Sequence, residues 1–235
     1  MNISIFIRTY KNDLEWLKYC LKSIHKYVTG YNRIVVCIPE NQVRLLKDFN
    51  LEYVVTCPVY EDDYLGQQVS KLMADTYCGS EYVVYVDSDC VFTEPVDLTK
   101  RMFFKGKPIL YKTHYSKVGE AICWKDVTEK SLNIKGIEWE YMRRMPIIYK
   151  SETIKDLRDY LELIHDRTLE NHVIARKYRT YSEFNVLGAY AESFCKDDYH
   201  IHDTEFGIEP NFLIQHWSWG GVTPEIRKHI EEICK

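Results

Sequence analysis

The chain has 235 residues, of which 46% are hydrophobic, 14% aromatic and 28% charged, so it is long enough and apolar enough to bury a substantial core as one domain. A formal net charge of −4 argues against a general nucleic-acid or anionic-membrane surface, because both need an excess of positive charge. No apolar run approaches the roughly 20 residues that cross a bilayer, and the amino terminus has no signal-peptide pattern. We therefore expect a soluble, cytoplasmic protein with no transmembrane segment and no nucleic-acid partner.

Strand and helix patterns alternate through residues 1–92. Short apolar runs bounded by turn residues predict strands at 3–7, 34–38, 53–56 and 82–86. Apolar residues at helical spacing predict helices at 14–28, 40–49 and 62–77. Asn12 or Asp13 can cap the first of these helices. This alternation predicts an α/β fold with a mostly parallel sheet, right-handed crossovers and helices on its faces.

Beyond Phe92 the pattern is less regular. Helices are predicted at 151–167, at 182–192 with Ser182 as the cap, and from Thr223 onward, where Pro224 occupies the first helical position. Strands are predicted at 109–112, 199–202 and 212–216. Residues 106–144 show weak periodicity, and we expect a loop-rich region there.

Eight cysteines are spread along the chain and none forms a Cys-x-x-Cys pair. Several lie in apolar runs, where a reduced cysteine behaves as a small hydrophobic residue. We expect them to be reduced thiols of the core.

The strand predicted at 82–86 ends at two aspartates one residue apart, Asp87 and Asp89. Its apolar run indicates a strand buried on both faces, so the carboxylates emerge at the carboxyl edge of the sheet, where open α/β sheets bind ligands. Two acids so close repel each other unless a cation or hydrogen-bond donors lie between them. The pair suggests a divalent metal held against a phosphorylated substrate.

These features resemble the GT-A fold of nucleotide-sugar glycosyltransferases, in which a Rossmann-like half of about ninety residues closes with an Asp-x-Asp motif. Further segments follow the order found in glycosyltransferases of bacteria and large algal viruses, at 6–10, 66–71, 82–89, 181–188 and 216–217. The resemblance implies a single GT-A domain over 1–235. Residues 1–92 would form its nucleotide-binding half, and residues 93–235 a loop-rich acceptor-side half with a C-terminal helix.

The resemblance also implies a metal-dependent transfer of sugar from a nucleotide-sugar donor, a UDP-sugar in particular, to a glycan or glycoconjugate acceptor. The leaving group would be a nucleoside diphosphate. A cation on its phosphates, Mn²⁺ or Mg²⁺, would stabilise the charge that develops as the glycosidic carbon gains oxocarbenium character.

By similarity, Asp89 ligates this metal directly, and Asp87 contacts the ribose or a metal-bound water. His216 resembles the histidine that serves as the third protein ligand in glycogenin-like members of the fold, although the lysine downstream in that motif is missing here. Such a mixed ligand set favours Mn²⁺ over Mg²⁺. Without a metal, 87–89 would be an Asx turn, and His216 would be a hydrogen-bonded histidine at a strand end.

A second group of residues is expected to bind the donor nucleotide. Gln67 and Lys71 lie at positions i and i+4 of the helix that leads into the Asp-x-Asp strand, so both can face one cleft. Lys71 can pair with a phosphate or with Asp87, and Gln67 can bind the ribose or the base. The alternative is that both are polar side chains on the solvent-exposed face of the helix and bind nothing. Ser88, between the two aspartates, belongs to the same expected donor site.

Arg8, Thr9 and Tyr10 follow the first strand, where GT-A enzymes hold the base. Tyr10 can stack on uracil or act as a helix staple. Arg8 can neutralise a phosphate or an acid.

Glu183 lies in the first turn of the helix at 182–192, which the resemblance places near the acceptor. A carboxylate there can deprotonate the incoming hydroxyl group, as an inverting transferase requires. The alternative is a favourable charge at the helix N-terminus, worth about 0.3–1 kcal/mol.

Two other classes of protein also fit parts of the pattern. A haloacid-dehalogenase-like phosphatase would use Asp87 as its nucleophile, although that strand normally comes first in the domain. A carbohydrate-binding module would use the aromatic residues but would not explain a nucleotide-type fold.

Overall fold

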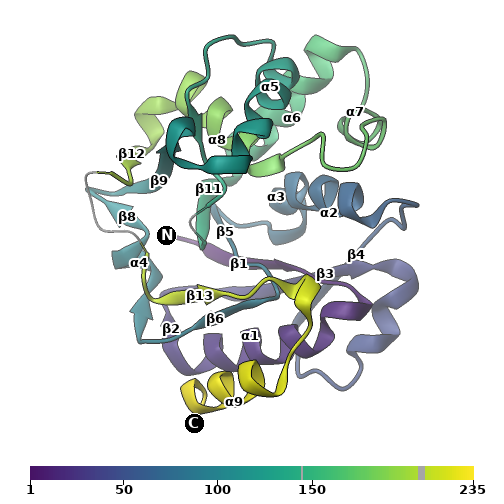
Figure 1. The fold of residues 1–235 in the computed structure, drawn as a ribbon, viewed down its shortest axis with the longest axis vertical. Helices are drawn as coiled ribbons and strands as arrows, with labels where there is room; N and C mark the ends of the chain where they lie inside the picture. Colours follow the sequence, from purple (N-terminus) through teal and green to yellow (C-terminus); the bar gives the residue numbers. More distant parts are fainter. Residues whose placement is uncertain (144, 206–209) are drawn as a thin grey trace.

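A five-stranded sheet organises the chain, which the computed structural model describes over residues 1–143, 145–205 and 210–235 (Figure 1). Neighbouring strands follow the order β4 (Tyr53–Cys57), β3 (Arg33–Pro39), β1 (Ile3–Arg8), β5 (Tyr82–Tyr85) and β11 (Ile147–Lys150). The first four strands are parallel, and β11 is antiparallel to β5. The predicted α/β class and mostly parallel sheet are confirmed, with one antiparallel strand that was not predicted.

Burial along each strand follows its place in the sheet. Every residue of the central strands β1 and β5 is buried, because packed elements cover both faces of the sheet. Along β4, half-buried and exposed residues alternate as far as Thr56, as expected for a strand at the edge. The carboxyl ends of the four parallel strands therefore form one edge of a rigid, buried scaffold.

Helices lie on both sides of this sheet. Figure 1 shows α1 (Leu14–Tyr27) on one side with α9 (Pro224–Ile233) next to it, and α2 (Asp63–Leu72), α3 (Ala74–Cys78) and α6 (Ser151–His165) on the other. Trp16 and Tyr19 of α1 form a small core with Ile230 of α9. Met73 interrupts the helix predicted at 62–77, dividing it into α2 and α3.

A second sheet belongs to the later part of the chain. Its strand β9 (Lys107–His114) pairs with β8 (Phe103–Phe104), β10 (Trp139–Glu140) and β12 (His200–Asp203). Helices α5 (Cys123–Leu132) and α8 (Glu183–Phe194) contact its strand β10, whereas α7 (Leu169–Ile174) packs against α2 and α6. The loop-rich region expected at 106–144 was thus predicted incorrectly in part. It contains β9, α5 and β10, whose formation depends on contacts with distant segments, including α8.

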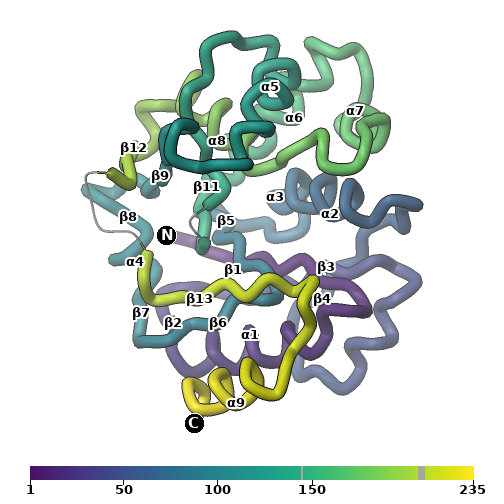
Figure 2. The backbone as a smooth tube through the Cα atoms, viewed as in Figure 1, coloured from purple at the N-terminus to yellow at the C-terminus, as the bar shows by residue number. Residues whose placement is uncertain are grey.

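Two short ribbons join segments that are far apart in the sequence. Strand β6 (Cys90–Phe92), directly after the Asp-x-Asp motif, pairs antiparallel with β13 (Leu213–Gln215). The trace in Figure 2 shows these two strands running side by side. The other ribbon joins β2 (Val28–Thr29) to β7 (Val96–Asp97), which leads into α4 (Leu98–Arg101). The first ribbon carries the C-terminal part of the chain to the edge where the aspartates lie.

The helix starts show where local patterns decide the structure. Thr223 caps α9 as predicted, its side-chain oxygen accepting from the Ile226 N–H at 3.3 Å. Asp13 and Ser182 precede α1 and α8, but neither side chain makes a capping hydrogen bond. The capping predictions for these two helices are therefore wrong, because Ser88 engages the Asp13 side chain and Asn185 engages the Ser182 side chain. The helix predicted at 40–49 is a 3₁₀ segment, η2 (Glu40–Leu46).

All eight cysteines are free thiols. Six are buried as predicted, Cys195 is half-buried, and Cys123 is exposed. Within the described parts of the chain, no helix has the length and apolarity to cross a bilayer.

Helix α8 passes so close to Tyr141, the residue after β10, that only glycine fits at one position. A Cβ atom on Gly188 would lie 2.3 Å from Cγ of Tyr141, a residue with only 5% exposure. We expect Gly188→Ala to lower the free energy of unfolding by about 1–3 kcal/mol, because overpacking forces buried groups apart. Urea denaturation measures this change. Gly220→Ala is the matched control, since a Cβ there meets no atom within 4 Å, and equal stability of the two variants would contradict the prediction.

Candidate functional site

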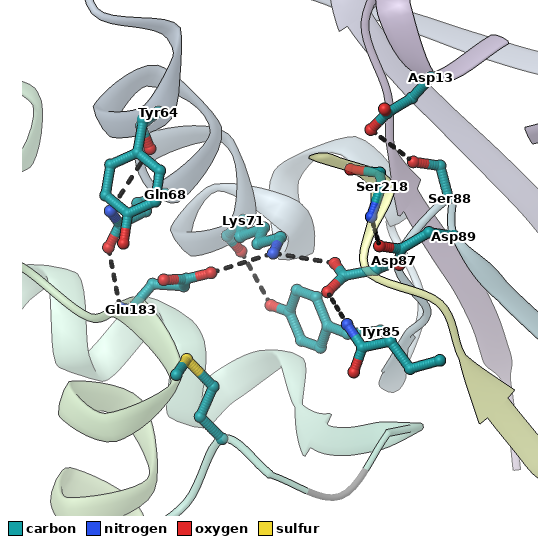
Figure 3. A network of polar contacts seen from close by, with 12 residues as sticks. Asp13, Tyr64, Gln68, Lys71, Tyr85, Asp87, Ser88, Asp89, Glu183 and Ser218 are labelled. Carbon is teal, nitrogen blue, oxygen red and sulfur yellow. Dashed lines mark hydrogen bonds and ion pairs between the residues drawn. The ribbon is translucent and has the colours of Figure 1, made fainter. Parts of the chain in front are cut away.

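The Asp-x-Asp motif forms the turn between β5 and β6, at the carboxyl edge of the parallel strands. The Cys90 N–H donates to the Asp87 carbonyl oxygen at 3.0 Å and closes the turn. Figure 3 shows that side chains from α2, α8 and the segment after β13 converge on this turn. The expected position of the two aspartates at this edge is confirmed.

Asp89 is 7% exposed and its two carboxylate oxygens differ. Oδ2 accepts a hydrogen bond from the Ser218 N–H at 2.9 Å, whereas Oδ1 is buried and has no hydrogen-bond partner among the described residues. Burial, followed by the charge of Asp87, raises the pKa of Asp89 to about 7. A buried carboxylate with an unsatisfied oxygen is costly unless a cation or a donor completes its contacts.

Asp87 is held by two side chains from different elements. Its Oδ1 lies 2.9 Å from Nζ of Lys71, and its Oδ2 accepts from the Gln215 amide at 3.2 Å. Lys71 is buried and bridges to a second carboxylate, with Nζ 3.0 Å from Glu183 Oε1. Burial alone would lower the pKa of Lys71, but Asp87 and Glu183 outweigh it and raise that pKa. Of the predicted partners for Lys71, the structure provides Asp87.

Glu183 begins α8 with its backbone tied to α2. Its N–H donates to the Gln68 side-chain oxygen at 3.2 Å, so Gln68 satisfies a helix-start donor that Ser182 leaves free. The Ser182 hydroxyl instead accepts from the Asn185 side chain at 2.8 Å. The predicted residue Gln67, one position earlier, is half-buried. Helix α2 therefore supplies Lys71 and Gln68 to this cluster.

His216 follows β13 and is fixed beside Asp89 through the backbone. Its N–H donates to the Asp89 carbonyl oxygen at 2.9 Å, and its ring stacks on Trp16 with centroids 5.4 Å apart. Nε2 is buried and has no hydrogen-bond partner among the described residues. Burial, and then the charge of His229, lower the pKa of His216. The ring is thus held neutral, which is the form that binds metals.

Arg8, Thr9 and Tyr10 lie at the end of β1. The Arg8 guanidinium is buried and donates to the Thr9 carbonyl oxygen at 2.6 Å and to Asp63 at 2.5 Å. The acid predicted as one possible partner of Arg8 is therefore Asp63. Thr9 is buried, with its N–H bonded to the Cys37 carbonyl oxygen at 2.9 Å, and Tyr10 is half-buried.

Asp13 is a site residue that the sequence did not reveal. Its carboxylate is 9% exposed and accepts from the Ser88 hydroxyl at 3.1 Å, across 75 positions of sequence. The sequence suggested only a helix cap at this position. Only the closeness of Asp13 to the end of β1 in the sequence could have indicated this role, because residues just after a parallel strand lie at the carboxyl edge of the sheet. Gln68, Gln215 and Ser218 were also missed.

The cluster carries an excess of negative charge. The cluster contains the carboxylates of Asp13, Asp87, Asp89 and Glu183, and the buried Lys71 pairs with two of them. A second buried cation, Arg8, pairs with Asp63 instead. Together, Asp89 Oδ1 and His216 Nε2 offer unsatisfied oxygen and nitrogen donors of the kind that Mn²⁺ accepts. In the described part of the chain, no group of three or more His, Cys, Asp or Glu side chains is already arranged around a common metal position. A bound ion would therefore complete its coordination with substrate or water oxygens.

Two cavities open elsewhere, one of about 430 Å³ beside the start of β3 and one of about 450 Å³ beside β8 and β12. None of the acidic residues of the cluster lines either cavity. The cluster is thus defined by its chemistry and by its position at the sheet edge.

A family model described as "Family of unknown function (DUF6492)" matches residues 1–219. The matched segment contains every site residue described above, from Arg8 to Ser218, and stops before α9. The sequence has no match among curated proteins.

Proposed function

The chain belongs to the DUF6492 family of unknown function, and we propose that it is a metal-dependent glycosyltransferase of GT-A architecture. It would transfer a sugar from a nucleotide-sugar, a UDP-sugar in particular, to a glycan or glycoconjugate acceptor. The observation that carries this proposal is the buried, unpartnered Oδ1 of Asp89 at the carboxyl edge of the sheet. Ligands of open α/β sheets bind at that edge.

The arrangement of strands supports the GT-A assignment. The Asp-x-Asp motif follows a parallel strand, and β13 brings His216 to the same turn by pairing with β6. This resembles glycogenin-like members of the fold, in which a histidine on a late strand completes the metal site. Gly220 and Gly221 follow His216, where that family has a glycine turn near the pyrophosphate.

Asp89 and His216 would hold a divalent cation, Mn²⁺ in preference to Mg²⁺. When bound, the cation would neutralise charge on the departing nucleoside diphosphate. The chain's own residues prepare this site before any ligand enters. Lys71 and Gln215 fix both oxygens of Asp87, and the Ser218 N–H orients Asp89. Such fixed groups stabilise developing charge without further rearrangement.

Glu183 is the proposed base for the acceptor hydroxyl. Its Oε1 is held by Lys71, and its backbone is held by Gln68. These contacts place a rigid carboxylate on the α8 side of the cluster, opposite the segment that carries Ser218 (Figure 3). Proton transfer to such a positioned group contributes about 10²–10⁴-fold to a rate.

Two exposed tryptophans next to the site support a sugar as ligand. Trp217 and Trp219 are 66% and 87% exposed and flank Ser218, whose N–H contacts Asp89. Large rings exposed beside a polar site commonly mark a binding surface, because their apolar faces gain from being covered.

The phosphatase alternative is less well supported. A nucleophilic Asp87 needs a carboxylate oxygen free to attack phosphorus, yet Lys71 and Gln215 engage one oxygen each. The motif also follows β5, which is the last of the four parallel strands in chain order, whereas the nucleophile of such phosphatases normally follows the first strand of the domain. The other alternative, a carbohydrate-binding module, does not explain why several carboxylates are buried together at this edge of the sheet.

The test is a screen of donor hydrolysis across nucleotide sugars, with and without Mn²⁺. Metal-dependent release of UDP from one UDP-sugar supports the proposal. Hydrolysis of simple phosphate esters, with no nucleotide-sugar turned over, would favour the phosphatase instead.

His216→Ala is expected to weaken Mn²⁺-dependent UDP binding by about 10–100-fold, the range seen when groups supporting a metal site are lost. High Mn²⁺ should restore part of the activity, because the other ligands remain. Calorimetric titration of metal and nucleotide measures the effect. His25→Ala, at an exposed position of α1, is the control. A His216→Ala variant that titrates like the wild type would assign this histidine to packing on Trp16.

A further inference from the structure

Asp13 ends the 3₁₀ turn η1 (Lys11–Asp13) and precedes α1. A side chain at such a position normally caps the helix, yet this carboxylate makes no capping bond and accepts from the Ser88 hydroxyl instead. Figure 3 shows Asp13 directed at the Asp-x-Asp turn. The chain therefore forgoes a helix cap to place a carboxylate against this turn.

That placement adds negative charge where it is already in excess. Asp13 is buried, and both Asp87 and Asp89 lie within electrostatic reach of it. Burial raises the pKa of Asp13, while the hydrogen bond from the Ser88 hydroxyl and the positive charge of Arg8 oppose that rise. Nζ of Lys71 pairs with Asp87 and Glu183 and leaves Asp13 without an ion pair in the described part of the chain.

The unpartnered oxygen of Asp89 indicates that a cation would balance this negative charge. Oδ1 of Asp89, a side chain with 7% exposure, has no hydrogen-bond partner in the described structure. Both acids are held at the same turn, since the Ser88 hydroxyl, next to Asp89 in the chain, donates to Asp13, and the Ser218 N–H donates to Asp89. Groups that surround the ligands of a metal commonly set its affinity by charge and by hydrogen bonding.

We propose that Asp13 is a third acidic group of the cation site, which strengthens metal binding through its charge without touching the ion. This inference rests on the proposed metal-dependent function and adds a residue that the Asp-x-Asp motif does not include. Asp13 is accordingly a positioning residue. Its effect should appear in the affinity for the metal alone, before any nucleotide binds.

The experiment is calorimetric titration of the nucleotide-free protein with Mn²⁺, repeated by following the electron paramagnetic resonance signal of free Mn²⁺. Asp13→Asn keeps the size of the side chain and an oxygen that accepts from Ser88, but it removes the charge. We expect its Kd for Mn²⁺ to rise by about 10–100-fold. Asp13→Glu, which restores the charge, should recover part of the affinity.

Two controls separate charge from other effects. Ser88→Ala removes the hydroxyl contact and leaves the Asp13 charge, so we expect a smaller loss than in Asp13→Asn. Asp126→Asn removes the same charge from an exposed position of α5 and should leave Kd unchanged. Circular dichroism checks that each variant is folded. If Asp13→Asn prevents folding, the neutral variant Asp13→Ser takes its place, and undiminished Mn²⁺ affinity in that variant would overturn the proposal.

The other outcomes are equally distinct. Wild-type affinity in Asp13→Asn would overturn the proposal, as would equal losses in Asp13→Asn and Ser88→Ala, because the hydroxyl contact alone would then explain the effect. Asp89→Asn is titrated in parallel. If it abolishes Mn²⁺ binding while Asp13→Asn does not change it, only the role of Asp13 fails. If the wild type itself binds no Mn²⁺, the proposed metal-dependent function fails as well.

Discussion

Asp89→Asn is expected to abolish Mn²⁺-dependent UDP binding and sugar transfer while the protein stays folded. The substitution keeps the size of the side chain and an oxygen for the Ser218 N–H, but it removes the charge that would bind the metal. A neutral amide oxygen cannot replace a carboxylate beside two phosphates and Mn²⁺. Calorimetry with UDP, with and without Mn²⁺, measures the loss directly.

The same substitution should stabilise the metal-free protein at neutral pH and above. Burial and Asp87 raise the pKa of Asp89 in the folded state to about 7, above the roughly 3.9 of an unfolded chain. The folded state therefore holds a proton that the unfolded state has lost between these values, so wild-type stability falls as pH rises through this window. Asparagine has no such proton, and the melting temperature of Asp89→Asn should exceed that of the wild type at pH 8.

Asp126→Asn is the matched control for both measurements, because it makes the same exchange at an exposed position of α5. It should bind UDP and Mn²⁺ and melt like the wild type. Unchanged metal-dependent UDP affinity in Asp89→Asn would exclude Asp89 as a metal ligand. A loss of folding in that variant would show that the carboxylate supports the turn between β5 and β6.

Glu183→Gln is expected to lower the rate of sugar transfer by about 10²–10⁴-fold, the effect typical of removing a general base. Donor affinity should change little, because the partner of this base is the acceptor hydroxyl and not the pyrophosphate. Glutamine keeps the side-chain size and the helix start, where the backbone N–H bonds to Gln68. The rate deficit should shrink at high pH, where solvent hydroxide can take the proton. Single-turnover kinetics with preloaded donor measures the chemical step.

Glu192→Gln tests whether losing any ion pair from α8 has the same effect. Glu192 lies on the same helix and pairs with Lys112 at 2.6 Å. Its substitution should cost some stability and leave the transfer rate intact. A normal rate in Glu183→Gln, with only a small loss of thermal stability, would mean that Glu183 serves the helix N-terminus. A product of retained configuration, measured by NMR, would also argue against a base role.

The strands of the first half were predictable because their formation depends on local apolar runs. Central strands such as β1 and β5 are buried on both faces, so their sequences are mostly apolar, with Ser4 the one polar residue among residues 3–7 of β1. The same rule placed Asp87 and Asp89 at the carboxyl edge, since parallel strands share one edge. Thr223 was predictable for a similar reason, because a helix cap acts within three residues.

Pairing between distant segments required the tertiary structure. Strand β11 has only four residues and was not predicted, because β5 supplies its hydrogen bonds. Strand β13 lies within the strand predicted at 212–216, but the sequence did not indicate that its partner is β6. The pairing of β13 with β6 is what brings His216 and Ser218 to Asp89.

The same distinction holds inside the site. The sequence by itself offered Asp87 as one possible partner of Lys71, because the predicted helix that carries Lys71 precedes the strand that ends at the Asp-x-Asp motif. Only the tertiary structure decided that Lys71 bridges Asp87 to Glu183, that Gln68 rather than Gln67 holds the start of α8, and that Asp13 contacts Ser88. Periodicity specifies which face of an element is buried. The partner of a side chain from a distant part of the sequence depends on how whole elements pack against each other.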